Sequence, residues 1–222
     1  MRLVVAAAAA LCACLACTDL PEEETVGLST LWIRDSLAVR AILDVNGRGD
    51  LNVGDIIGIE DVDGERRVTG LWLQHVSAAL VLPPVLGDLQ ALRVLVLDTC
   101  GLTSLPGHIC GLRSLRELYL KGNDIQSLPA DIGLLDNLMV LEAPDNHIDR
   151  LPPELAGAEK LSALILHHNL LADFPAELVA HPVLRNQGAD MAFNKLCNPL
   201  GPAKEDWLTM RDPNWRTTQQ CP

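Results

Sequence analysis

Aromatic and basic residues are scarce in this sequence. Four Trp, two Phe and one Tyr make up 3% of the 222 residues, so the recognition of bases by ring stacking has little to use. Lys and Arg total 17 against 29 Asp and Glu, which leaves a formal net charge of −12. Because nucleic-acid binding depends largely on Lys and Arg, we expect no nucleic-acid partner. No apolar run reaches the roughly 20 residues that a membrane-spanning helix needs.

Hydrophobic residues, by contrast, make up 49% of the sequence, and leucine is prominent among them. The length allows one domain of ordinary size or two small ones, with enough apolar material for a core. Since aromatic rings are few, that core has to be built from aliphatic side chains.

The N-terminal residues resemble a bacterial export signal. A charged start is followed by an uncharged apolar run over residues 3–16. The tetrapeptide Leu-Cys-Ala-Cys that ends at Cys14 resembles the lipobox, whose cysteine is lipidated and becomes the new N-terminus; Cys17 is the other candidate. A plain cleaved signal is the alternative. We expect a signal peptide over 1–16, an acidic tether over 17–28, and an extracytoplasmic protein lipid-anchored to the bacterial membrane, in the periplasm or at the cell surface.

Leucines recur at a constant spacing of 23 residues through the second half of the chain. Each segment fits Leu-x-x-Leu-x-Leu-x-x-Asn-x-Leu-x-x-Leu-Pro followed by an apolar return, as in LRELYLKGNDIQSLPADIGLLDN. This pattern resembles the leucine-rich repeat in the 23-residue Leu-Pro form of bacterial and plant intracellular proteins. The resemblance implies an α/β-type solenoid over residues 68–196, a horseshoe with a parallel sheet on its concave face. The recurring leucines are Leu92, Leu115, Leu138, Leu161 and Leu184.

Each repeat position has a structural reason. Leu118 and Leu120 alternate on a short strand and point inward, so Tyr119 points outward. An asparagine column, with Cys100 in its first place, is expected to satisfy buried backbone groups of neighbouring coils. A proline opens each return segment, where no ladder N–H is needed. The asparagines are Asn123, Asn146, Asn169 and, two residues late, Asn194; the prolines are Pro106, Pro129, Pro152 and Pro175.

A solenoid needs caps because its terminal coils would otherwise expose their leucines. At the N-terminal end, over 29–67, we expect a helix that begins at Asp35 or Ser36 and is stopped by Gly47. The remaining expectations are a helix face of Leu37, Ala41, Ile42 and Val45, and a hairpin of strands at 56–59 and 68–73 around Asp63 and Gly64.

At the other end, residues 197–222 are expected to form a cap with an amphipathic segment over 204–211. Cysteine-flanked caps recur in secreted repeat proteins, so we expect a disulfide between Cys197 and Cys221. Such a bond would contribute about 3 kcal/mol in the chain-entropy model. Two further cysteines, whose pairing stays open, are Cys100 and Cys110.

Two segments are candidate metal sites. Residues 44–55 resemble an EF-hand or dockerin calcium loop, but Arg48 stands at the fifth position, where an oxygen ligand is required. We favour a polar turn after a helix. His167 and His168 are adjacent, and because adjacent strand residues face opposite ways, a metal shared by both rings would be strained. We therefore expect no metal site and no cofactor.

Catalytic motifs such as a serine nucleophile elbow, a Walker loop or HExxH are not recognisable in the mature chain, so we expect no enzyme. The outward strand positions mix small apolar residues with charges of both signs. Apart from Tyr119, Lys121, Glu142, Ile165 and His167, these positions are Val94, Val96, Asp98, Glu117, Val140, Pro144 and Ala163.

The concave face, at about 400 Å², offers roughly half of the 800 Å² that each side of a standard interface buries. The prediction is a monomeric, non-enzymatic module that binds an unidentified protein or peptide through this face and the adjoining loops. A structural envelope or surface protein without a dedicated ligand is the alternative. The site residues that we assign are Tyr119, Lys121, Glu142, Ile165 and His167, with Tyr119 as the only aromatic anchor.

Overall fold

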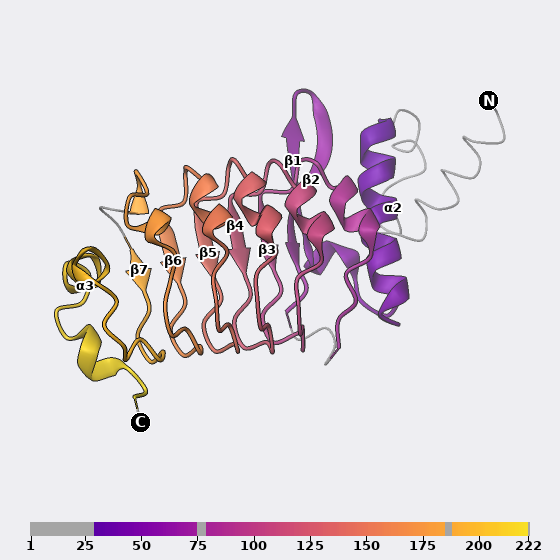
Figure 1. Cartoon of the computed structure of the whole chain (residues 1–222). Helices are drawn as coiled ribbons and strands as arrows, with labels where there is room; N and C mark the ends of the chain where they lie inside the picture. Colours follow the sequence, from indigo (N-terminus) through magenta and orange to yellow (C-terminus); the bar gives the residue numbers. More distant parts are fainter. Residues whose placement is uncertain (1–28, 75–78, 185–187, 222) are drawn as a thin grey trace, which may run out of the picture.

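A seven-stranded sheet runs through the described part of the molecule with its strands in chain order (Figure 1). The computed structural model describes residues 29–74, 79–184 and 188–221. The first two strands are antiparallel and every later neighbouring pair is parallel, which confirms the predicted sheet. Within the described ranges no helix is long and apolar enough to cross a membrane. The strands are β1 (Ile57–Val62), β2 (Glu65–Trp72), β3 (Val94–Val96), β4 (Glu117–Tyr119), β5 (Val140–Glu142), β6 (Ala163–Ile165) and β7 (Ala189–Asp190).

Each coil returns to the next strand through a short 3-10 helix on the side opposite the sheet. The predicted prolines stand directly before four of these helices and have extended backbone. Proline has no backbone N–H, and none is needed at these positions because they do not pair in the sheet. The 3-10 helices of the coils are Pro84–Asp88, Gly107–Gly111, Ala130–Leu134, Pro153–Gly157 and Ala176–Leu178.

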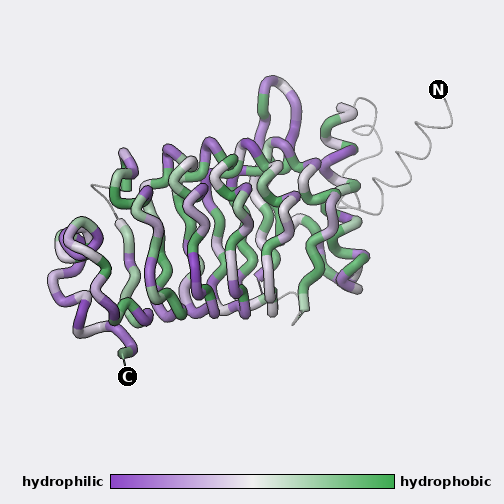
Figure 2. Tube along the Cα trace, viewed as in Figure 1, coloured by the Kyte–Doolittle hydropathy of each residue, from purple (hydrophilic) through white to green (hydrophobic). Residues whose placement is uncertain are grey.

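The core is a stack of aliphatic side chains between the sheet and the 3-10 helices. Figure 2 shows that hydrophobic residues, in green, recur in each coil of the solenoid. All five leucines of the 23-residue series are fully buried, as are Leu118 on β4 and Leu120 directly after it. Because each coil places its leucines against those of the next, the solenoid has one continuous core.

The asparagine column satisfies the backbone inside the turns, as predicted. Asn146 accepts a hydrogen bond from the N–H of Ile125 at 3.0 Å and donates to the carbonyls of Leu120 and Ala143 at 2.9 and 3.3 Å. Asn123 and Asn169 do the same in their coils, and the late Asn194 joins the column through the N–H of Leu171. Cys100 fills the first place, and its thiol donates to the carbonyl of Leu73 at 3.0 Å.

The N-terminal cap begins earlier than the sequence predicted. Helix α2 spans Thr30–Val45, and the Ser29 hydroxyl caps it by accepting from the N–H of Trp32 at 3.2 Å. The predicted start at Asp35 or Ser36 is therefore wrong, and so is most of the predicted face. Leu37 and Val45 are 39% and 52% exposed, while the buried face consists of Trp32, Asp35, Ala38, Val39, Ile42 and Leu43.

Asp35 lies inside the helix because it has a distant partner. Its carboxylate accepts from the Arg67 guanidinium through two bonds, at 2.8 and 3.1 Å, and from the N–H of Val68 at 3.0 Å. The side chains of Asp35 and Arg67 are 0% and 9% exposed. The hydrogen bond to Asp35 and the neighbouring carboxylates raise the pKa of Arg67 despite its burial, so the guanidinium stays charged. It fastens α2 to β2.

The segment after α2 is a turn, as favoured above. Gly47 has a φ of 64°, which confirms the left-handed stop. Two carboxylates of the calcium-like loop face arginines: Asp44 lies 2.9 Å from Arg40, and Asp50 accepts from Arg48 at 3.1 Å. The hairpin that follows turns at Asp63 and Gly64, as predicted, although β1 and β2 are longer than expected.

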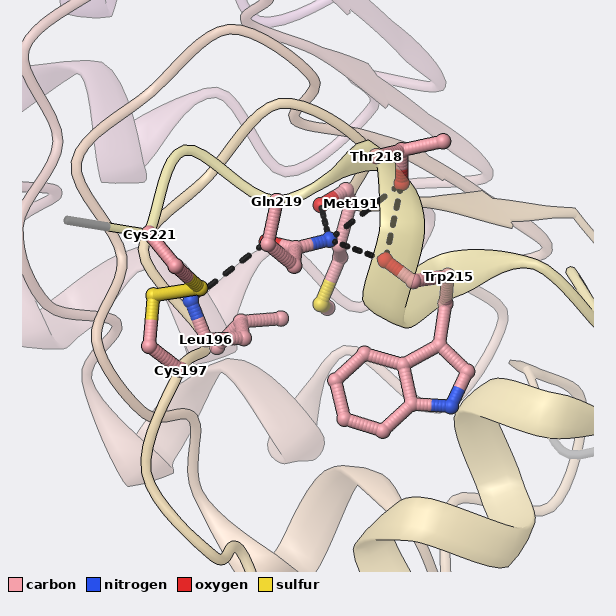
Figure 3. The surroundings of a disulfide bond; sticks show 7 residues. All are labelled: Met191, Leu196, Cys197, Trp215, Thr218, Gln219 and Cys221. Carbon is pink, nitrogen blue, oxygen red and sulfur yellow. Dashed lines mark hydrogen bonds between the residues drawn. A yellow bond between two sulfur atoms is a disulfide. The ribbon is translucent and has the colours of Figure 1, made fainter.

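The C-terminal cap covers the last coil with helix α3 (Pro202–Thr209) and a tail fixed by the predicted disulfide, Cys197–Cys221. Trp207 and Trp215 are buried against the coil. Figure 3 shows Gln219 beside the disulfide, with its amide donating to the carbonyls of Met191 and Trp215 at 3.3 and 3.0 Å. The two cysteines whose pairing was open, Cys100 and Cys110, are buried and not disulfide-bonded.

Candidate binding surface

The exposed face of the sheet, predicted above as the concave face, consists of rows that run across the strands. In the parallel register, Tyr119 on β4 lies beside Glu142 on β5, which lies beside Ile165 on β6. Three of the predicted site residues are thus direct neighbours. We call the row to which they belong the central row; its members are Trp72, Val96, Tyr119, Glu142, Ile165 and Asp190.

Trp72 gives this face a second aromatic residue, which the sequence-based prediction missed. It pairs with Val96 across β2 and β3, and its ring packs over two glycines. A Cβ added at Gly70 would lie 2.3 Å from the Trp72 ring, and one at Gly58 would lie 3.0 Å from it. This position was hard to recognise because Leu71 pairs with Leu95, 24 residues on, whereas the next three strand pairs repeat every 23 residues.

Carboxylates surround Tyr119. Its hydroxyl donates to Glu117 at 2.8 Å, and Glu142 is its neighbour in the central row. Burial, the bond to Glu117 and the charges of Glu142 and Asp98 together raise the pKa of Tyr119 to about 12. The phenol therefore stays protonated at neutral pH in a negatively charged patch.

Lys121 and His167 lie just beyond the strand ends, where the ladder continues. The carbonyl of Lys121 accepts from Thr99 at 2.8 Å, and that of His167 accepts from Asp145 at 3.1 Å. The N–H of Lys121 donates to the Asp98 carboxylate at 2.7 Å. Both predicted residues therefore border the central row on the side where the strands end.

Two positions predicted to point outward are buried. Val96 is 7% exposed because the larger Trp72 and Tyr119 flank it in the central row. Pro144 is buried between the coils of Lys121 and His167. The usable surface is accordingly smaller than the strand alternation predicted.

The histidine pair has a different geometry from the one predicted. His168 has a φ of 56°, a left-handed conformation that ends the strand alternation. The Nδ1 atoms of His167 and His168 therefore lie 2.8 Å apart, in hydrogen-bond contact, instead of pointing to opposite faces. The Phe193 ring stacks on His168 with the ring centres 4.3 Å apart. The prediction that the two side chains face opposite ways is wrong.

Comparison with known families agrees with this architecture. Residues 73–181 match the family described as leucine-rich repeat region. With the parallel sheet, the buried leucines and the asparagine column, this match decides the fold. The chain forms a leucine-rich repeat solenoid. No protein with a curated function matches its sequence.

Several solved leucine-rich repeat structures resemble this solenoid. A leucine-rich repeat protein of Leptospira interrogans is 24% identical with a TM-score of 0.51, over 63% of this chain and 33% of its own. The ectodomain of the receptor kinase SOBIR1 from Arabidopsis thaliana is 23% identical with a TM-score of 0.52, over 68% and 89%. These two likenesses show the fold alone. The BIR3–SERK2 complex from the same plant contains a chain that is 29% identical with a TM-score of 0.50, over 61% and 71%.

The remaining site residues divide into two groups. Cys197 and Cys221 form the predicted disulfide. Cys14 and Cys17 lie outside the described residues, so the lipobox assignment stays a prediction, as does the boundary of the tether at residue 28.

Proposed function

We propose that the solenoid is a non-enzymatic binding module that takes a positively charged, extended segment of a protein or peptide on the exposed face of its sheet. The observation that carries this proposal is the central row, where Tyr119, Glu142 and Ile165 are contiguous. Further acidic groups lie close to these residues: Asp98, Glu117 and Asp190.

The dimensions of the row favour an extended segment over a globular partner. Six strands, β2 to β7, contribute to it, and strands lie about 4.8 Å apart, so the row is about 24 Å long. An extended chain rises about 3.4 Å per residue, which places about seven residues along the row. A peptide of that length can alternate basic and apolar side chains against the carboxylates and the Trp72, Tyr119 and Ile165 side chains.

Among the structural likenesses, the BIR3–SERK2 structure is one in which a leucine-rich repeat chain is in complex with another protein. That likeness supports a protein-type partner for the present chain. The partner's identity and the oligomeric state are part of the proposal, which takes the module to be a monomer.

Site-specific photocrosslinking in cells tests the assignment. A photoreactive amino acid at Tyr119 or Ile165 should yield a saturable adduct, whereas the same group at Leu134, 46% exposed on a 3-10 helix, should not. Replacing Tyr119, Glu142, Ile165 and His167 together by alanine should abolish capture of the same partner. Raised salt should weaken it, since the attraction is largely between exposed charges.

A partner that binds the quadruple variant as well as the parent chain would overturn the assignment of the face. Failure to find any saturable adduct from either face position would favour the structural envelope protein considered above.

We further propose that the module works outside the cytoplasm, held by a lipid on Cys14 or Cys17. The signal-like sequence supports this, and the Cys197–Cys221 disulfide is of the kind that persists in oxidising compartments. Mass spectrometry of the mature N-terminus tests it, because each cysteine predicts a different diacylglyceryl peptide. A mature N-terminus without lipid would refute the anchor.

A further inference from the structure

Three metal-ligating side chains from two adjacent coils converge at the end of the sheet's exposed face. One ring nitrogen of His167, one of His168 and a carboxylate oxygen of Asp145 all lie within 4.8 Å of one another. His168 Nδ1 is 2.8 Å from His167 Nδ1 and 3.8 Å from Asp145 Oδ1. We infer that Asp145, His167 and His168 form a binding site for a divalent first-row transition metal, with Zn²⁺ as the ion that fits its chemistry.

The distances suit a tetrahedral ion after small side-chain rotations. Zn²⁺ binds imidazole nitrogen and carboxylate oxygen at about 2.0–2.1 Å, which separates neighbouring ligand atoms by about 3.3 Å. The two measured separations therefore lie about 0.5 Å on either side of that value. Two imidazoles and one carboxylate leave a fourth position for water, and this ligand set suits Zn²⁺, Ni²⁺ or Cu²⁺ better than Ca²⁺ or Mg²⁺.

The repeat backbone holds these ligands in place. The residue before each ladder position has a left-handed backbone, and Asp145 and His168 occupy that place in successive coils with φ values of 56° each. Backbone bonds fasten both turns: the Asp145 N–H donates to His167 at 3.1 Å and the His168 N–H donates to Ala192 at 3.0 Å. Phe193, the left-handed residue of the next coil, stacks on the His168 ring and limits its rotation.

The site is open to an incoming ion. The side chains of His168 and Asp145 are 44% and 43% exposed. The surrounding chain carries a formal net charge of −12, which favours the approach of a cation. A metal here would not require the peptide partner proposed above, so the two proposals can fail separately.

Titration of the full chain with Zn²⁺ alone tests the site. Calorimetry should show one saturable site that H168N and D145N each weaken by at least about 10-fold, since loss of a ligand costs no less than loss of an outer-shell partner. Both substitutions keep a residue type that tolerates the left-handed backbone, so the coil should fold normally. Unchanged melting temperatures would show that it does.

H147A is the matched control. His147 faces Asp124 at 3.5 Å one coil earlier, as an exposed histidine–aspartate pair. Among the described residues this pair belongs to no group of three metal-ligating side chains. Its loss should leave the affinity unchanged. NMR of the imidazole nitrogens gives a second readout: at one equivalent of Zn²⁺, the signals of His167 and His168 should shift before those of His147.

Three results would overturn the inference: no saturable Zn²⁺ binding, equal weakening by H147A and H168N, or binding that leaves the His167 and His168 signals in place, as binding at a cysteine thiol would.

Discussion

The buried ion pair between Asp35 and Arg67 makes the N-terminal cap unusually sensitive to a single substitution. In D35A the Arg67 guanidinium loses both of its bonds to the carboxylate, and the N–H of Val68 loses its acceptor. Because the Arg67 side chain is only 9% exposed, water cannot fully replace these partners. Breaking a buried pair in this way costs about 3–5 kcal/mol, and we expect D35A to lower the free energy of unfolding by that amount.

The assay is urea unfolding followed by circular dichroism, with hydrogen exchange of the α2 amides to detect separate detachment of the cap. D44A is the control in the same helix: Asp44 lies 2.9 Å from Arg40, but the two side chains are 55% and 33% exposed. Such an exposed i,i+4 pair contributes about 0.3–0.5 kcal/mol, so D44A should change stability little.

The double variant D35L/R67M separates two explanations. If an uncompensated charge causes the loss, removing both partners should regain most of it, although the Val68 N–H remains without its acceptor. A loss below about 1 kcal/mol in D35A, or a double variant as unstable as D35A, would refute the reasoning.

Three further changes test the solenoid. N146A leaves the buried N–H of Ile125 without its acceptor and removes one of the donors to the carbonyls of Leu120 and Ala143, so it should cost about 1–3 kcal/mol in urea unfolding; a loss below about 0.5 kcal/mol would contradict the ladder's role. G133A places a Cβ 1.9 Å from the carbonyl oxygen of Glu154 and should cost about 1–3 kcal/mol, whereas G111A, with no atom within 4 Å, should not destabilise. Burial raises the pKa of the Cys110 thiol to about 11, above its unfolded value, so stability should be full below about pH 8.5 and fall as pH rises towards 11. The difference in stability between the parent chain and C110A should shrink over that range, and a constant difference would contradict it.

The period of the repeat was sufficient to predict the fold. Five leucines at one spacing place five coils in register, and every one of them is buried because a coil can hide its apolar residues only against the next coil. The asparagine column could be predicted for the same reason. It includes Asn194, which comes two residues later than the 23-residue spacing would place it.

The start of helix α2 was predicted wrongly because one of its side chains binds a partner far along the chain. From its local sequence Asp35 resembles a helix cap. In the structure it lies inside the helix, where its carboxylate accepts a hydrogen bond from Arg67, 32 residues later. The sequence carries no local sign of that pairing.

The predicted orientation of His167 and His168 was wrong for a different reason. Alternation holds only while the backbone is extended, and the left-handed turn at His168 ends it. A signal was present: Gly122 occupies the equivalent place one coil before Asp145, and a glycine there indicates a positive φ for the whole column.

The two ends of the sheet leave little free backbone for a strand from another molecule. At one end β1 has an irregular register between Gly58 and Ile59 and exposes Glu60 and Asp61, features that oppose pairing along an edge. At the other end β7 has only two residues, and the following turn is already bonded to the tail through Phe193 and Thr218 at 2.9 Å. Copies of the protein can therefore be crowded together without joining sheet to sheet, which is the main route by which open β-structures aggregate.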